Sequence, residues 1–171
     1  GLGQLRRFAQ ELPVPEGACV PVAQSKYLDR DSPHLCRALE GSAATILLPS
    51  GLAAVTVPLL AFLEAGDHAL IVDSVYFPTR RFANGMLRKL GVSVDYYDPA
   101  IGAGISALMK PETKVVFTES PGSNTFEMQD IPAIAKAAHA RGAVVMMDNT
   151  WATPLFFKPM DQTAADQAQD I

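Results

Sequence analysis

This sequence contains little cysteine and no excess of basic residues. Only Cys19 and Cys36 occur among its 171 residues, and they do not form a Cys-x-x-Cys pair. Two such cysteines cannot build a disulfide framework, which favours a reducing compartment such as the cytoplasm. Lysine and arginine number 14 against 18 aspartates and glutamates, a net charge of −4. A nucleic-acid-binding protein is not expected, because no basic excess is available to neutralise phosphates.

Long hydrophobic runs are also missing once the turn residues are considered. Residues 41–63 carry no charge, which is long enough to suggest a membrane span. The turn tripeptide at 49–51 divides this run into a strand at 44–48 and a helix at 52–63, so no membrane segment is expected. Residues 8–11, which follow two arginines, are not the apolar core of a signal peptide.

The rest of the chain alternates between short apolar runs and amphipathic segments. We predict strands at 44–48, 69–72, 92–96, 114–117 and 143–147, separated by helices at 52–63, 79–90, 101–109 and 131–140. Such alternation with short connections is typical of right-handed βαβ units. The expected fold class is therefore α/β, with a mostly parallel sheet and helices on both faces. A mean hydropathy of +0.13 agrees with strands that are buried on both sides.

The two ends of the chain fit this alternation less well. Residues 1–32 are polar and broken by proline, with at most one helix at 4–12. Residues 159–171 contain no apolar run of strand type. We therefore expect an irregular N-terminal segment, a partial α/β domain over residues 33–158 and an atypical C-terminal tail.

The helix at 52–63 begins directly after a strand, with the sequence Ser50-Gly51-Leu52. The first N–H groups of a helix lack partners within the helix and carry the positive end of its dipole, so a phosphate group fits there. Glycine also lets the backbone approach a ligand closely. The simpler alternative is an ordinary helix whose first turn is capped by the serine hydroxyl.

Two other strand ends carry side chains suited to a flat, cationic ligand. Asp148 ends the strand at 143–147, where an unpaired carboxylate would be costly, so it needs a cation or a hydrogen-bond donor. A protonated heteroaromatic nitrogen, as in pyridoxal phosphate, is a suitable partner. Tyr76 follows the strand at 69–72 and could cover such a ring. The alternatives are a carboxylate that caps the next turn and an amphipathic tyrosine that needs no ligand.

Motifs for other chemistries are lacking. The two Gly-x-Gly pairs lack the third glycine and the preceding strand of a dinucleotide site. His34, His68 and His139 are too scattered for a set of metal ligands, so no metal is expected. Ser50 does not lie in a Gly-x-Ser-x-Gly sequence, which argues against a serine hydrolase.

Several short motifs follow one another between residues 35 and 159: Leu48-Pro49-Ser50-Gly51-Leu52, Asp73-Ser74-Val75-Tyr76, Glu119-Ser120-Pro121-Gly122-Ser123 and Asp148-Asn149-Thr150-Trp151. In order and spacing they resemble the Cys/Met-metabolism family of pyridoxal-phosphate-dependent enzymes. The last two motifs are most similar to the cystathionine β-lyase branch. The resemblance implies the large cofactor domain of the fold-type I enzymes, here incomplete, with pyridoxal 5′-phosphate as cofactor.

The resemblance also implies roles for individual residues. The cofactor-binding candidates are Gly51, Leu52, Tyr76, Ser123, Asp148 and Thr150. The backbone amides of the first two would hold the phosphate. Tyr76 would stack on the pyridine ring and help to move protons, and Asp148 would keep the ring nitrogen protonated. These last two are the catalytic candidates, and Glu119 would line the same rim.

By the same resemblance, the activity is that of a carbon–sulfur β-lyase of sulfur amino-acid metabolism. Cystathionine would give homocysteine, pyruvate and ammonia by covalent catalysis. The expected partners are a sulfur-containing amino acid and further copies of the chain, because the family forms homotetramers. A γ-synthase or γ-lyase of the trans-sulfuration pathways is an alternative.

The sequence departs from the family pattern at the lysine that carries the cofactor. Lys158 lies in Phe-Phe-Lys-Pro, which resembles the segment before the lysine motif and not the motif itself. The sequence Tyr27-Leu28-Asp29-Arg30 also differs in spacing from the family's phosphate-binding Tyr-x-Arg. A truncated or degenerate relative without catalysis is therefore the second hypothesis.

Overall fold

The computed structural model describes residues 22–24, 38–42 and 45–159, and a four-stranded parallel sheet forms its centre. In spatial order the strands are β4 (Ser93–Tyr97), β3 (His68–Val72), β5 (Thr113–Glu119) and β6 (Val144–Asp148). All three pairings between neighbours are parallel. The predicted α/β class with a mostly parallel sheet is confirmed.

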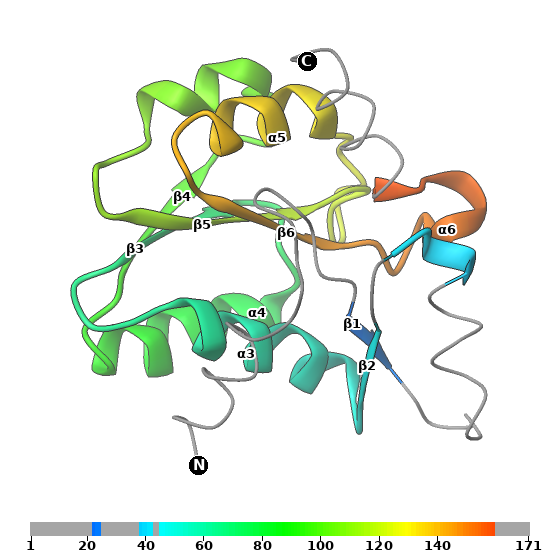
Figure 1. Cartoon of the computed structure of the whole chain (residues 1–171), viewed down its shortest axis with the longest axis horizontal. Coiled ribbons are helices and arrows are strands. Elements are labelled where there is room, and N and C mark those ends of the chain that lie inside the picture. The colour runs from blue at the N-terminus through cyan, green and yellow to red at the C-terminus, as the bar shows by residue number, and fades with distance from the viewer. Residues whose placement is uncertain (1–21, 25–37, 43–44, 160–171) are drawn as a thin grey trace.

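Helices cover both faces of this sheet (Figure 1). Helices α3 (Gly51–Phe62) and α4 (Phe77–Phe82) lie on one face. Helix α5 (Ile131–His139) and the 3₁₀ turn η2 (Gly102–Ala107) pack together on the other face. This double cover explains why the central strands are continuous apolar runs and not alternating ones. The core contains the buried side chains of Leu59, Leu70, Ile71, Val72, Leu87, Ile105, Val115, Val116, Ile134 and Val145.

Capping side chains set the starts of the two longest helices. The Ser50 hydroxyl accepts a hydrogen bond from the Ala53 N–H at 3.1 Å, at the start of α3. The Asp130 carboxylate accepts one from the Ala133 N–H at 3.1 Å, at the start of α5. Gly142 lies just beyond α5 with φ of +72°, the left-handed backbone that commonly ends a helix.

The segment predicted as one helix at 79–90 differs in detail. Helix α4 begins earlier, at Phe77, because a proline in its first turn needs no N–H partner. It then widens into the π-helical turn η1 (Ala83–Leu87), which contains an Asn-Gly pair. The helix expected at 101–109 is only the 3₁₀ turn η2, in a segment with two glycines.

A second, two-stranded parallel pair lies beside the main sheet. It consists of β1 (Val22–Gln24) and β2 (Ile46–Leu48). The strand β1 was not expected within residues 1–32. The predicted helix at 4–12 and most of the tail at 159–171 lie outside the described residues.

The described chain ends with the short helix α6 (Thr153–Phe156). Within the described ranges, no helix combines the length and the apolar character that crossing a membrane requires.

Candidate functional site

The carboxyl ends of three adjacent strands meet at one edge of the sheet. Because the strands are parallel, the segments that follow them leave the sheet on the same side, where open α/β sheets bind ligands. Strand β3 leads to Tyr76, β5 ends at Glu119 and β6 ends at Asp148. The pairing of β5 with β6 sets Glu119 directly beside Asp148. We call this edge the carboxyl rim.

Two hydrogen bonds join the loop after β3 to the loop after β5. The Tyr76 N–H donates to Glu119 Oε2 at 2.8 Å. The Ser123 N–H donates to the Ser74 carbonyl at 2.8 Å. Gly122 lies so close to the Ser74 side chain that a Cβ at position 122 would clash with the Ser74 hydroxyl oxygen. These contacts hold the two loops together as one wall of the rim. The close approach of the loops requires glycine at position 122, because any larger residue would clash.

Glu119 is the most perturbed acid of the rim. Its side chain is 97% buried, with a relative exposure of 3%. Burial and the nearby charge of Asp148 raise its pKa to about 7, although the N–H groups of Tyr76 and Ser123 act in the opposite direction. The sequence placed Glu119 on the rim but did not predict this perturbation. The signal was its position as an acid that directly ends a run of buried residues.

Asp148 is half-buried at the end of β6. Its Oδ1 accepts hydrogen bonds from the Thr150 N–H at 3.0 Å and from the Thr150 hydroxyl at 2.5 Å. The predicted need for a hydrogen-bond donor is thus met locally by Thr150. No cation pairs with Asp148 among the described residues, which leaves the carboxylate able to accept from a ligand.

Tyr76 has an exposed ring, with 47% of the residue accessible to solvent. Its backbone is held by Glu119, whereas its ring is free to cover a flat ligand. The Ser74 hydroxyl and the Asn149 side-chain oxygen are buried without a hydrogen-bond partner within the described part of the chain. Buried polar atoms of this kind are unusual and are often found where a ligand or water completes the structure.

The predicted anion site falls on the first turn of α3. The Ser50 hydroxyl and carbonyl accept from the N–H groups of Ala53 and Ala54. This leaves Gly51 and Leu52 as the residues whose amides have no partner within the helix. Figure 1 shows the first turn of α3 next to β2, on the side of the molecule toward which β6 and α6 run.

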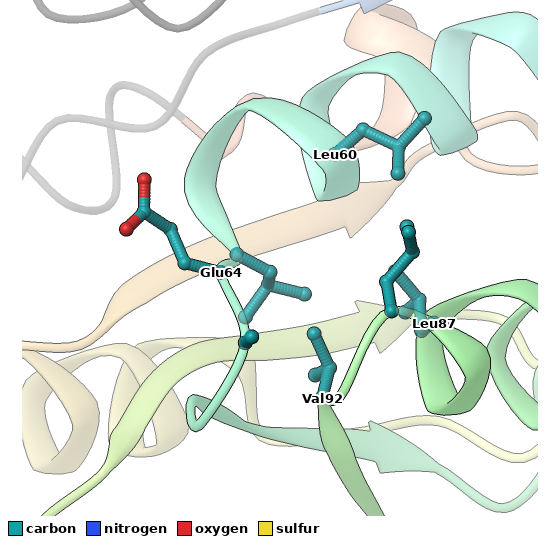
Figure 2. A pocket seen from close by; sticks show the side chains of 7 residues that line it. Leu60, Glu64, Leu87 and Val92 are labelled. Carbon is teal, nitrogen blue, oxygen red and sulfur yellow. The ribbon is translucent and has the colours of Figure 1, made fainter.

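A cavity of about 280 Å³ lies elsewhere, next to the C-terminal end of α3 (Figure 2). It is lined by Leu60, Leu63, Glu64, Ala65, Leu87, Leu90 and Val92. The Glu64 carboxylate points away from the labelled leucine and valine side chains in Figure 2. None of the predicted site residues borders this apolar cavity, so it offers nothing to a phosphorylated cofactor.

A second polar cluster lies near the opposite, amino end of the sheet. His68 is completely buried, with Nδ1 2.7 Å from the Thr113 hydroxyl and Nε2 3.2 Å from Asp95 Oδ2. The Lys110 ammonium donates to the same Asp95 oxygen at 2.5 Å. Burial lowers the pKa of His68, so the ring is neutral and Nε2–H donates to Asp95. We call these residues the amino-end cluster.

Neither group of residues forms a metal centre. Within residues 22–24, 38–42 and 45–159, no cluster of three or more His, Cys, Asp or Glu side chains could hold a metal ion. Of the histidines considered in the sequence, His34 lies outside the described residues.

A comparison with known protein families confirms the resemblance noted in the sequence. Residues 33–166 match the model of the Cys/Met metabolism PLP-dependent enzymes. The chain belongs to this family. The residue types at the rim and at the start of α3 suit its cofactor on chemical grounds: backbone amides for a phosphate, a carboxylate for a pyridinium nitrogen and an exposed ring for stacking.

Individual relatives agree with the family. A Rhizobium johnstonii protein whose name contains the words cystathionine beta-lyase is 70% identical over 124 residues, covering 72% of this chain and 31% of that protein. Cystathionine beta-lyase MetC of Escherichia coli is 47% identical over 125 residues, covering 72% of this chain and 32% of the relative. The chain thus spans about a third of the length of these relatives.

A solved structure shares the fold. The metB crystal structure from Corynebacterium glutamicum superposes with a TM-score of 0.72 at 28% sequence identity. The similarity covers 75% of this chain and 33% of that structure. The described sheet and helices therefore correspond to one part of a larger enzyme fold.

Proposed function

We propose that this chain is the cofactor-binding part of a pyridoxal-phosphate-dependent carbon–sulfur β-lyase. Family membership supports the cofactor, and the relatives named as cystathionine beta-lyases support the reaction. The observation that supports the proposal in the structure is the carboxyl rim, where the half-buried Asp148 carboxylate ends β6 and the exposed Tyr76 ring follows β3, the two strands on either side of β5. The net reaction is cystathionine and water to homocysteine, pyruvate and ammonia.

Each rim residue has a defined task in this proposal. The Gly51 and Leu52 amides bind the phosphate at the positive end of the α3 dipole. The Asp148 carboxylate accepts from the protonated pyridine nitrogen, and Thr150 holds that carboxylate in place. Tyr76 covers the ring. When bound, the cofactor supplies an electron sink for the carbon next to the substrate amine.

Ser123 contributes through its backbone. Its N–H is already used by the Ser74 carbonyl, so the residue acts by fixing the wall of the site. The Ser123 side chain is only partly buried and remains a candidate for contact with the cofactor. Its predicted role is thus retained as part of the proposal.

A second candidate function is cofactor binding without turnover. The sequence around Lys158, Phe-Phe-Lys-Pro, does not resemble the lysine motif of the family. The charge of Lys158 acts on Glu40, where it opposes the rise in pKa caused by burial. A chain without a lysine that can carry the cofactor would bind pyridoxal phosphate without turning over a substrate.

Assembly and location complete the proposal. We expect a homo-oligomer with the family's tetrameric arrangement, because large apolar side chains such as Leu155 and Phe156 are exposed on the described surface. We expect a cytoplasmic location, in line with the low cysteine content.

The first test is equilibrium dialysis of the purified chain against pyridoxal phosphate. We expect saturable binding, and we expect Asp148→Asn to weaken it by about tenfold or more, since a charge-assisted hydrogen bond is lost. Asp98→Asn is the matched control, because Asp98 also follows a strand and accepts from an N–H two residues later, at 2.8 Å. Equal affinities of the two variants would contradict the assignment of Asp148.

The second test is the release of 2-oxo acid from cystathionine. Pyruvate supports the β-lyase, whereas 2-oxobutyrate supports the γ-cleaving alternative. Saturable binding with no product supports the non-catalytic candidate and contradicts turnover by this chain.

A further inference from the structure

Glu119 and Asp148 are lateral neighbours in a parallel sheet. They are paired in register at the carboxyl ends of β5 and β6. Because side chains alternate between the faces of a strand, residues that are paired in register project from the same face. Neighbouring strands lie about 4.8 Å apart, so two carboxyl groups at these positions strongly influence each other.

The backbone around Glu119 is held firmly in place. The Gln129 side-chain amide donates to the Glu119 carbonyl at 2.7 Å, and the Gln129 N–H donates to the Ser120 hydroxyl at 3.0 Å. The buried Tyr97 hydroxyl lies 2.9 Å from the Gln129 side-chain oxygen. Glu119 therefore cannot escape burial by a small movement of the strand end.

Among the described residues, hydrogen-bond donors but no cation act on the Glu119 carboxyl. The N–H groups of Tyr76 and Ser123 act on its carboxyl from the loops after β3 and β5. The charged group that faces it from β6 is Asp148. Arg80 on α4 is engaged elsewhere: it binds Asp73 at 2.6 Å and lies 4.0 Å from the centre of the Tyr96 ring.

Two carboxyl groups in this arrangement do not ionise independently. The second negative charge is disfavoured by the first, and the proton remains on the more deeply buried partner. Glu119 is almost completely buried, whereas Asp148 is half-buried and is stabilised by two Thr150 donors. The unequal surroundings therefore favour the neutral form at Glu119, which is the more deeply buried of the two acids.

We propose that Glu119, buried beside Asp148 at the strand ends, keeps its proton near neutral pH, so that the rim does not place two negative charges side by side. Glu119 is then a positioning residue: it accepts the Tyr76 N–H, which sets the place of the aromatic ring, and it adds no second anion beside the ligand. The protonation of Glu119 is a property of the chain without cofactor. Only the identity of the ligand rests on the proposed function.

The test is a carbon-13 NMR titration of the purified chain with labelled glutamate side-chain carboxyl carbons. We expect one glutamate signal to titrate near pH 7, and we expect Glu119→Gln to remove it. Glu127→Gln is the matched control, because Glu127 lies in the same loop but is exposed. That variant should leave the signal near pH 7 in place.

Coupling between the two acids is tested by Asp148→Asn. Loss of the neighbouring charge should move the titration of Glu119 to lower pH, while Asp98→Asn should not move it. The proposal is overturned if the Glu119 signal titrates in the ordinary glutamate range. It is also overturned if Asp148→Asn leaves the titration of Glu119 unchanged. These readouts come from the cofactor-free chain, so they stand even if the proposed function fails.

The positioning role is tested by cofactor binding. Glu119→Gln retains the shape and an acceptor for the Tyr76 N–H, so its affinity for pyridoxal phosphate should stay within about threefold of the unaltered chain. Glu119→Ala removes the acceptor and should weaken binding by about tenfold. Equal affinities of the Gln and Ala variants would overturn the positioning role. If neither the unaltered chain nor either Glu119 variant binds pyridoxal phosphate, but the NMR titration is as expected, only the proposed function is contradicted.

Discussion

The two ends of the central sheet both contain buried polar side chains, but they use them differently. In the amino-end cluster, each ring nitrogen of His68 has a partner from the chain, and Lys110 closes the network through Asp95. At the carboxyl rim, within the part of the chain that the structure describes, the hydrogen bonds of Asp148 come from its neighbour Thr150, and the Ser74 hydroxyl has no partner. A satisfied cluster stabilises the fold, whereas an incompletely satisfied one is prepared for a ligand.

This contrast assigns a role to one of the histidines. In the sequence, the three histidines are too scattered for a set of metal ligands, and no role was predicted for His68. In the structure it connects three segments of the amino end, namely β3, β4 and the start of β5. Its role is structural, whereas the proposed cofactor site lies at the other end of the same strands.

The largest expected effect comes from removing the centre of the amino-end cluster. His68→Ala leaves a cavity and deprives Thr113 and Asp95 of partners, so the free energy of unfolding should fall by about 3 to 4 kcal/mol. The measurement is the urea midpoint, with pyridoxal phosphate binding measured at low urea. A loss of cofactor affinity greater than the loss of folded protein would mean that the two ends are not separate in function.

The next effect concerns Glu119 and the pH dependence of stability. Its pKa is raised in the folded state from an ordinary value of 4.5 to about 7, so folding favours the protonated form. Its contribution is fully present below about pH 4.5 and is lost as the pH rises through 7. The loss corresponds to about 2 to 3 kcal/mol.

Glu119→Gln should remove this part of the pH dependence. Urea midpoints of the variant and the unaltered chain should therefore diverge between pH 5 and 8, with the variant relatively more stable at the higher pH. Parallel curves for the two proteins would show that Glu119 is not protonated preferentially in the folded state. Glu127→Gln serves again as the control.

A smaller effect is expected from the close contact inside the rim wall. Gly122→Ala places a methyl group against the Ser74 side chain and should cost about 1 to 2 kcal/mol, with weaker cofactor binding. Adding Ser74→Gly removes the atoms that clash and should restore part of the affinity. Gly85→Ala is the matched control, because no atom lies within 4 Å of its new Cβ. A Gly122→Ala variant as stable as this control would contradict the contact.

The smallest effect is expected at the surface of the amino-end cluster. Lys110→Met removes an ion pair whose partners are both about half exposed, so the stability should change by about 0.5 kcal/mol or less at moderate salt. Thermal unfolding at low and high salt provides the measurement. A change as large as that of His68→Ala would show that the cluster depends on the surface charge and not on the buried ring.

Much of the fold followed from local patterns. The apolar runs that became β3, β5 and β6 lie within one or two residues of their predicted positions, because burial on both faces demands continuous apolar side chains. The serine cap of α3 also followed from a local pattern, because the capping hydroxyl and the N–H that it binds lie only three residues apart. The strand β1 was not, since three residues without a distinctive pattern become a strand only by pairing with β2.

The sequence alone determined the class of the fold, the family resemblance and the choice of Tyr76, Asp148 and the α3 start as candidates. These depend on residue type and spacing along the chain. Only the tertiary structure decided that Glu119 lies beside Asp148, that it accepts the Tyr76 N–H and that His68 is fully satisfied. Strand register and burial bring together residues that are distant in the chain, and the energy of a charge depends on those neighbours.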